Sequence, residues 1–425
     1  MKKKKAPLGR RMKEFVKTSV VWGPLDHNLF FTIIFLNVYG IIMVYSASYN
    51  NSITKNYSYF MNNQLKNVIF GFIIMIIASY INYHRIVRFG WGWFWLFLAV
   101  CIIAALKTPL AHSELGATRW IKLGSISFQA AEPIKAAIII FFAYYVSYWG
   151  LNRWYNQVLA CLLAIALLGF LFFFSNNLST VIVLFCICAV IILSSVKKPD
   201  LYWYFLIGLA LVIIAAIGVT VYLLMHQGAE NFRFVRIRAW LHPEEYAADE
   251  GLQAMQARYA IGAGGFWGKG LGQSLIKFKL SYSYNDFILA IICEELGVFG
   301  VIVMMTLFGY LLYRIYKIAQ NAWDIEGKVL AIGVFTQIAL QLLINVMVVT
   351  SVIPTTGVTL PFFSAGGTSV VFLLAELGMV LNVDKYAKER RFFEEAERHV
   401  AQMEERGGIG AAGWRRRLDS ARTRR

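Results

Sequence analysis

Hydrophobic and polar residues alternate along this chain in long blocks, not at every second or third position. Ten hydrophobic blocks approach the roughly 20 residues that a membrane-spanning helix needs. The pattern predicts an all-α, polytopic membrane protein with about ten transmembrane helices. The predicted spans are residues 28–47, 65–82, 91–106, 132–149, 157–174, 179–195, 201–225, 286–313, 328–350 and 366–383.

The composition supports this class. The chain is 58% hydrophobic and only 15% charged, whereas soluble domains carry about 25% charged residues. The five cysteines all lie in apolar runs, which argues against a disulfide framework. The histidines show no spacing typical of zinc ligands. We therefore expect no metal site and no evident cofactor, and leave a divalent cation requirement open.

The net charge of +17 predicts topology and argues against nucleic acid binding, because much of the excess lies in the tails and in short loops between spans. By the positive-inside rule, the basic N-terminus (residues 1–27) and the basic tail (residues 385–425) are both cytoplasmic. They flank a transmembrane domain of residues 28–384. The basic loops that set this orientation contain Arg85, Arg88, Arg153, Lys197, Lys198, Arg314 and Lys317.

Two loops that this topology places outside the cell are also basic. The first is residues 107–131, and the second is the large extracytoplasmic loop between spans 7 and 8, about residues 226–285. Long loops cross the membrane whatever their charge, so tolerance is one interpretation. The other is that Arg119, Arg236 and Arg258 bind an anion outside the membrane.

A glycine-rich run over residues 262–272 is not a nucleotide motif. Gly270 follows Lys269 where a P-loop needs Ser or Thr, and Trp267 replaces the last glycine of a dinucleotide fingerprint. Backbone N–H groups next to a lysine can cradle a phosphate. A tight turn packed on helices is the alternative.

Carboxylates near the large loop are the candidate acid–base groups. Asp286 suits either a helix cap or a general base at the membrane boundary. Helical rise places Glu294 and Glu295 about 12–14 Å from Asp286, too far for a paired-carboxylate site. We expect them to pair with another helix, because buried carboxylates need partners. Glu132 and Lys135, three residues apart, are expected to pair on one helix face.

Four motifs, in order along the chain, resemble those of the SEDS family (shape, elongation, division and sporulation proteins). A Leu-Gly-Gln-Ser run followed by Lys277 is more similar to the FtsW and SpoVE branch than to RodA. The motifs are Gly116–Ile121 with Phe128–Lys135, Ala260–Ser274, Asn285–Ile288 with Glu294–Gly297, and Pro354–Ser369.

The resemblance implies a bacterial inner-membrane glycosyltransferase that polymerises lipid II into glycan strands on the outer face. It implies a class B penicillin-binding protein partner and divisome or elongasome proteins. The family's catalytic aspartate falls on Asp286. The expected substrate-binding residues are Arg119, Gln129, Arg236, Arg258, Lys269 and Ser274, and the expected structural or coupling residues are Glu132, Lys135, Glu294, Glu295, Pro361 and Ser364.

Some positions depart from the family pattern, namely Asn177, residues 281–284 and Ala365. They leave Asp286 in place but put the outer-loop binding residues in question. Two alternatives to a polymerase remain at this stage: a flippase that moves lipid II across the bilayer, and a non-catalytic scaffold for a transpeptidase. The sequence does not decide among division, elongation and sporulation.

Overall fold

The computed structural model is predominantly helical. It describes residues 24–48, 59–114, 117–124, 126–175, 177–196, 232–246, 250–278, 285–364, 367–405 and 414–415. The elements are α2 (His27–Ser48), α3 (Tyr59–Tyr80), α4 (Tyr83–Val87), η1 (Phe89–Gly92), α5 (Trp93–Ala105), β1 (Ala111–Glu114), β2 (Ala117–Leu123), β3 (Ile126–Gln129), α6 (Ala131–Trp149), α7 (Trp154–Ser175), α8 (Leu178–Ser195), α10 (Phe232–Leu241), α11 (Glu250–Gly264), η2 (Ile276–Phe278), α12 (Ile288–Gln320), α13 (Ile325–Val349) and α14 (Thr368–Glu405).

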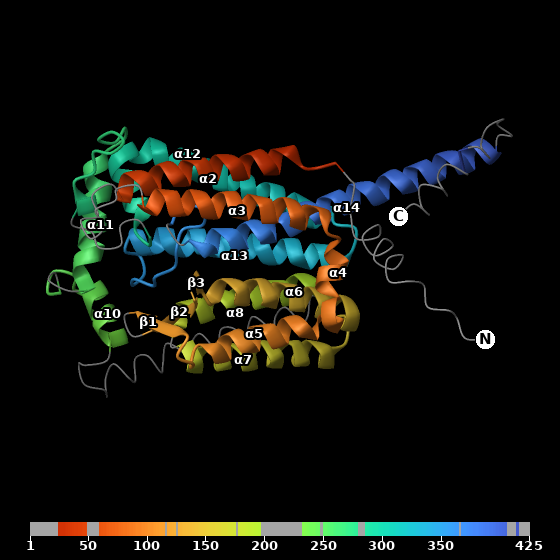
Figure 1. The fold of residues 1–425 in the computed structure, drawn as a ribbon, viewed down its shortest axis with the longest axis horizontal. Coiled ribbons are helices and arrows are strands. Elements are labelled where there is room, and N and C mark those ends of the chain that lie inside the picture. Colours follow the sequence, from red (N-terminus) through yellow and green to blue (C-terminus); the bar gives the residue numbers. More distant parts are fainter. Residues whose placement is uncertain are drawn as a thin grey trace.

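The long helices run side by side along the long axis of the molecule (Figure 1). In the described part of the chain, six of them are long and apolar enough to cross a membrane, namely α2, α3, α7, α8, α12 and α13. The predicted span 201–225 lies outside the described residues, and each of the other predicted spans overlaps a helix. The prediction of a helical, multi-pass membrane protein is therefore confirmed.

The two ends of the bundle differ. One end, which we call the loop end, carries β1–β3, α10 and α11, and α4 lies at the other (Figure 1). Figure 1 also shows α14 projecting past the bundle at the α4 end, because the last predicted span continues as one helix to Glu405. The loop end thus gathers the two loops that the topology prediction places outside the cell.

A small antiparallel sheet at the loop end was not predicted. The strands have the order β1-β2-β3, with Trp120 opposite Gln129 and Leu123 opposite Ile126. Gly124, with a φ of 63°, follows β2 and allows the tight reversal into β3. The expectation of helices throughout missed this sheet, in which β3 alternates apolar and polar residues but the longer β2 does not.

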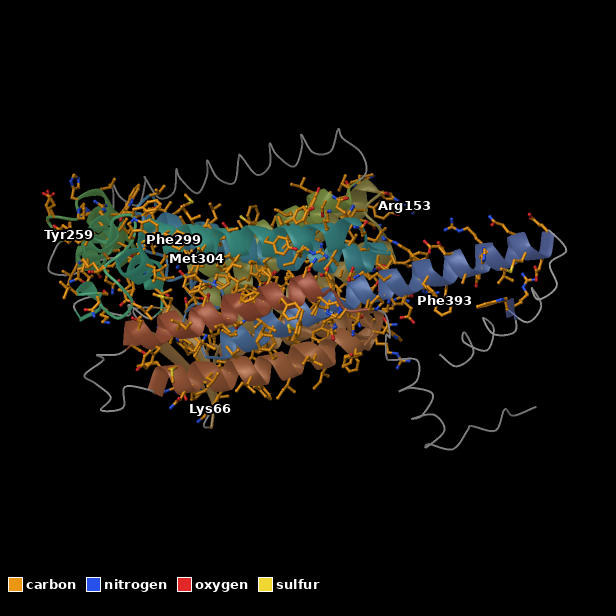
Figure 2. All side chains as sticks on the ribbon, turned by 90° about the horizontal axis from the view of Figure 1, so that it is seen from above. Lys66, Arg153, Tyr259, Phe299, Met304 and Phe393 are labelled. Atoms are coloured by element: carbon orange, nitrogen blue, oxygen red, sulfur yellow. The ribbon has the colours of Figure 1, made fainter. Side chains whose placement is uncertain are left out.

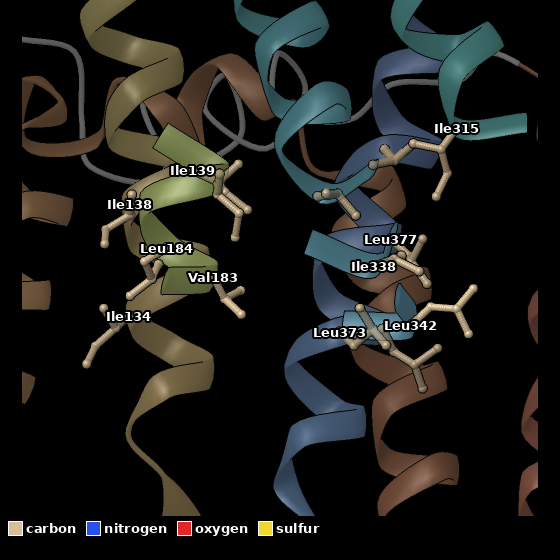
Figure 3. Close-up of a cluster of buried hydrophobic side chains, with 14 of the residues drawn as sticks. Ile134, Ile138, Ile139, Val183, Leu184, Ile315, Ile338, Leu342, Leu373 and Leu377 are labelled. Atoms are coloured by element: carbon tan, nitrogen blue, oxygen red, sulfur yellow. The ribbon is translucent and has the colours of Figure 1, made fainter. Parts of the chain in front are cut away.

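The core is made of branched aliphatic side chains from the central helices. Helix α13 packs against α6, α8, α12 and α14. Figure 3 shows Ile138, Ile139, Leu184 and Ile338 among the buried side chains of these helices. Gly333 of α13 lets α6 approach, since a Cβ there would lie 2.6 Å from Ile139 Cγ2.

A polar network joins α4 to the start of α13 at the α4 end of the bundle. Asp324 caps α13 by accepting a hydrogen bond from the Gly327 N–H at 2.8 Å, and it also contacts Tyr83 Oη at 2.8 Å and His84 Nε2 at 2.6 Å. Burial alone would raise the pKa of Asp324, but these hydrogen bonds outweigh burial and lower that pKa below its usual value. The network fixes α4 against the start of α13.

Candidate active site

A polar cleft opens at the loop end between α6, α8, α13 and the segment that follows α13. About 360 Å³ of it is unfilled by protein atoms, including space open to solvent. Its wall offers one ammonium group, one carboxylate, and several amides and hydroxyls, which suit a ligand rich in oxygen atoms. The lining residues are Gln129, Ala131, Glu132, Lys135, Asn177, Ser179, Thr180, Val183, Gln341, Thr356, Gly357, Val358 and Thr359.

A buried ion pair lies in this cleft. Lys135 Nζ is 2.8 Å from Glu132 Oε2, and both side chains are nearly inaccessible, which confirms the predicted pairing. Glu376 of α14 is buried close enough to interact electrostatically with both. Gln337 Nε2 donates a hydrogen bond to Glu376 Oε2 at 2.8 Å. Lys135 therefore lies near two carboxylates, Glu132 in the lining of the cleft and Glu376 buried behind it.

Asp286 is held next to the wall of the cleft through its backbone. The Asn345 side-chain amide donates to the Asp286 carbonyl and to the Val358 carbonyl, each at 2.9 Å. Ser364 Oγ donates to the Asn285 carbonyl at 2.9 Å. Because Val358 lines the cleft, Asn345 ties the half-buried Asp286 to that wall.

Asp286 lies one residue before the N-cap position of α12. The N-cap residue is Phe287, which makes no capping hydrogen bond through its side chain.

The glycine-rich run packs against a break in α12. Gly297 interrupts the helix with a φ of 67°. The Lys269 and Gly270 N–H groups donate to the carbonyls of Glu294 and Glu295, each at 2.9 Å. Gly268 has a φ of 77°, and a Cβ there would collide with the Glu295 carbonyl. The run is therefore a turn packed on a helix, the second of the two interpretations of its sequence.

Two buried carboxylates complete this contact. Glu294 accepts hydrogen bonds from Lys269 Nζ at 2.7 Å, from the Leu275 N–H at 3.2 Å and from the Ser274 hydroxyl. Glu295 accepts from Ser46 of α2 and lies 3.4 Å from Lys277 Nζ. We expected partners on another helix, but apart from Ser46 the loop supplies them.

The predicted cationic residues occupy different surroundings. Arg258 donates to Ser351 Oγ at 2.9 Å, and Trp240 donates to the Ser351 carbonyl at 2.9 Å, so both α11 and α10 are attached just after α13. Arg236 is half-buried in α10. Arg119 lies in β2, but its side chain is outside the described part of the structure.

Gln129 lines the cleft, whereas Ser274 is buried under the glycine-rich turn and holds it on Glu294. Pro361 and Ser364 line a second cavity, which shares Glu132 and Gln341 with the cleft. From the sequence, no role was assigned to Thr180 and Gln341 of the wall or to Asn345 behind it. Asn177 was named only as a departure from the family pattern, and residues 356–359 only within a family motif. The usable signal was polarity inside predicted membrane spans, since buried amides in such spans need a reason.

These features define a multi-pass helical membrane protein with a polar cleft at one end of the bundle. The profile of the FtsW/RodA/SpoVE family, described as a cell cycle protein, matches residues 26–389. The chain therefore belongs to the FtsW/RodA/SpoVE family, the SEDS family whose motifs it carries.

Curated relatives match along most of their length. A probable peptidoglycan glycosyltransferase FtsW from Trichlorobacter lovleyi is 32% identical, over 88% of this chain and 96% of the relative. Stage V sporulation protein E from Bacillus subtilis is 33% identical, over 84% of this chain and 96% of the relative.

Solved structures share the fold. A chain from "Structural coordination of polymerization and crosslinking by a peptidoglycan synthase complex" aligns with a TM-score of 0.72 at 22% identity, covering 86% of this chain and 99% of that one. The rod shape determining protein RodA of Thermus thermophilus aligns with a TM-score of 0.62 at 21% identity, covering 85% and 97%.

Proposed function

We propose that the protein is a peptidoglycan glycosyltransferase that polymerises lipid II on the outer face of the bacterial cytoplasmic membrane. Family membership and the names of the curated relatives support this activity. The structural observation that supports the proposal is the Asn345 bridge, which ties the Asp286 backbone carbonyl to the carbonyl of Val358 in the wall of a polar cleft. In the proposal the Asp286 carboxylate faces this cleft, where a carboxylate suits proton abstraction from a sugar hydroxyl.

In the proposed reaction Asp286 removes the proton from the acceptor sugar hydroxyl. The oxygen attacks the anomeric carbon of the donor sugar, the bond to undecaprenyl pyrophosphate breaks, and the pyrophosphate leaves with the bonding electrons. Gln129 lines the cleft, and we assign it to sugar oxygens. Lys135 was expected to be a coupling residue; because it also lines the cleft, we further assign it to phosphate oxygens, which would compete with Glu132 for its ammonium group. Arg119, Arg236 and Arg258 are the loop-end cations that we assign to the leaving pyrophosphate.

The structure changes the roles that we assign to two predicted binding residues. Lys269 is paired with Glu294, and the Ser274 hydroxyl is also bound to Glu294. We therefore assign both to holding the glycine-rich turn on α12, and no longer to direct contact with substrate.

A transporter is the second candidate, because polar groups continue below the cleft. Gln337 and Glu376 extend the polar floor toward the middle of the bundle. A transport path needs polar or mobile groups across the whole membrane. Below these residues Ile139 packs tightly against Gly333, which favours a closed cleft and thus an enzyme.

The deciding experiment uses the full-length protein in liposomes with purified lipid II, alone and with a class B penicillin-binding protein, its proposed partner. The expected result is long glycan strands on a gel. Movement of lipid II between leaflets without any polymer would instead identify a transporter. Neither activity, in folded protein with the partner present, would leave the scaffold role.

A further inference from the structure

The glycine-rich turn also presents an exposed aromatic surface, formed by Phe266 and Trp267. Phe266 and Trp267 are 53% and 74% exposed, although both are large and apolar. Their rings contact each other, with centroids 5.0 Å apart, and Trp267 also contacts Phe299 of α12 at 5.6 Å. One side of the turn is thus anchored by charge and the other presents an aromatic surface.

The height of this surface along α12 is fixed by the backbone. The Val298 N–H donates to the Gly265 carbonyl and the Phe299 N–H donates to the Phe266 carbonyl, each at 3.1 Å. These are the first two residues after the break at Gly297. Phe266 and Trp267 therefore lie level with the start of the second part of α12.

That second part of α12 is long enough to span the membrane by itself. Residues 298–320 extend about 34 Å at the usual helical rise, compared with roughly 30 Å of hydrocarbon. Its exposed side chains are apolar from the start, beginning with Val298, Phe299 and Ile302, and its far end exposes Tyr313 and Tyr316. By contrast, residues 288–292, before the break, are buried.

Aromatic residues at both ends of a lipid-facing strip are typical of membrane–water interfaces. Figure 2 shows Phe299 between Tyr259, at the tip of the loop end, and Met304, farther along the bundle. The exposed rings of Phe266 and Trp267 continue the lipid-facing strip of α12 at its outer end.

We propose that Phe266 and Trp267 form a membrane anchor that inserts into the boundary between lipid headgroups and acyl chains. The partner of this surface is the lipid bilayer. The anchor fixes the height of the glycine-rich turn, and through Glu294 and Glu295 the height of the loop end, relative to the membrane. It stands on the exposure and backbone contacts of the turn, independently of the proposed enzymatic activity.

The test places a nitroxide label at position 267 in full-length protein whose five native cysteines are replaced. The protein is reconstituted in nanodiscs of phosphatidylcholine and phosphatidylglycerol. Relaxation by oxygen, which concentrates in lipid, is compared with relaxation by a water-soluble nickel chelate. Tyr259→Cys, at the tip of the loop end (Figure 2), is the control expected to lie in water. Met305→Cys, at an exposed position of α12, is the control expected to face lipid. Phe266→Cys provides a second label in the proposed anchor.

The expected oxygen-to-nickel accessibility ratio at positions 266 and 267 is several-fold above that at 259 and below that at 305. A ratio equal to that at 259 would show that the turn lies in water and would overturn the proposal. Shielding from both reagents would also overturn it, by showing that protein covers the surface. Thermal unfolding of each labelled variant, compared with the cysteine-free parent, verifies the fold.

Discussion

Asn345 holds Asp286 in place through the backbone: its side-chain amide donates to the Asp286 carbonyl at 2.9 Å and to the Val358 carbonyl at the same distance. One fully buried amide thus joins the end of α13, the segment before α12 and the wall of the cleft. The position of the proposed general base therefore depends on Asn345, although Asn345 takes no part in the proposed proton transfer.

Replacing Asn345 should therefore impair activity more than the fold. Asn345→Leu keeps roughly the size of the side chain and removes both donors without introducing a charge. Two lost hydrogen bonds correspond to about 1–3 kcal/mol of unfolding free energy, and misplacement of Asp286 should lower polymerisation by roughly 10²-fold. Polymerisation rate and thermal unfolding are measured together.

Asn37→Leu is the matched control, because Asn37 is another buried asparagine, and its amide donates to the Ile33 carbonyl of its own helix. It should lose stability without a comparable loss of rate per folded molecule. If the two variants lost activity equally, the Asn345 bridge would have no special role.

The contact between the glycine-rich turn and α12 predicts that Glu294→Ala destabilises the protein more than Lys269→Ala. Glu294→Ala removes the acceptor for Lys269, for Ser274 and for two backbone N–H groups, whereas Lys269→Ala leaves the carboxylate with its other donors. We expect a loss of about 3 kcal/mol or more for Glu294→Ala and about 1–2 kcal/mol for Lys269→Ala. Chemical unfolding in detergent measures both. The reverse order would contradict the assignment of Lys269 to the turn.

Variants of the buried pair Glu132–Lys135 distinguish a loss of folding stability from a loss of activity. Lys135→Met leaves Glu132 as an uncompensated buried charge and should cost about 3–5 kcal/mol. Lys135→Met combined with Glu132→Gln removes both charges of the pair, leaves Glu376 with its hydrogen bond from Gln337, and should restore much of that stability. We expect the double variant to fold but to polymerise poorly, because the cleft has lost its lysine. A fully active double variant would exclude Lys135 from substrate binding.

The sequence predicted the long helices of this architecture but neither the break in α12 nor the small sheet. Long apolar blocks identify helices well, because a membrane span must satisfy its backbone hydrogen bonds internally. The break at Gly297 was not predicted, since its stabilising partners, the Gly265 and Phe266 carbonyls, come from a distant segment. The sheet at the loop end escaped prediction because short strands carry a weak periodic signal.

The site was predicted in part. Asp286, Gln129, Glu132 and Lys135 were singled out from the sequence, and the last three line one cleft. Lys269 was expected to face a phosphate, but it is bound to Glu294. Whether a given lysine faces a ligand or a buried glutamate depends on tertiary contacts, which charge patterns do not contain.

The capping network at the α4 end predicts acid sensitivity. The pKa of Asp324 is lower in the folded protein than its usual 3.8, so its ionised form favours folding. This stabilisation is present above pH 3.8 and is lost as the pH falls through the folded-state value. Asp324→Asn should therefore flatten the fall of the unfolding midpoint in that acidic range.

The matched control is Glu395→Gln, which removes an exposed carboxylate of α14 and should leave the acid profile of the wild type unchanged. Unfolding midpoints measured across the acidic range compare the three proteins. Equal steepness in wild type and Asp324→Asn would show that other groups cause the acid sensitivity.

The central claim is that Asp286 is the general base of a lipid II polymerase. The most direct measurement compares glycan polymerisation by wild type and Asp286→Asn in the same liposomes, with equal thermal unfolding as the condition for comparison. Removing a general base should lower the rate by about 10²–10⁴-fold while leaving the fold intact. A folded Asp286→Asn variant that polymerises lipid II at close to the wild-type rate would contradict the account.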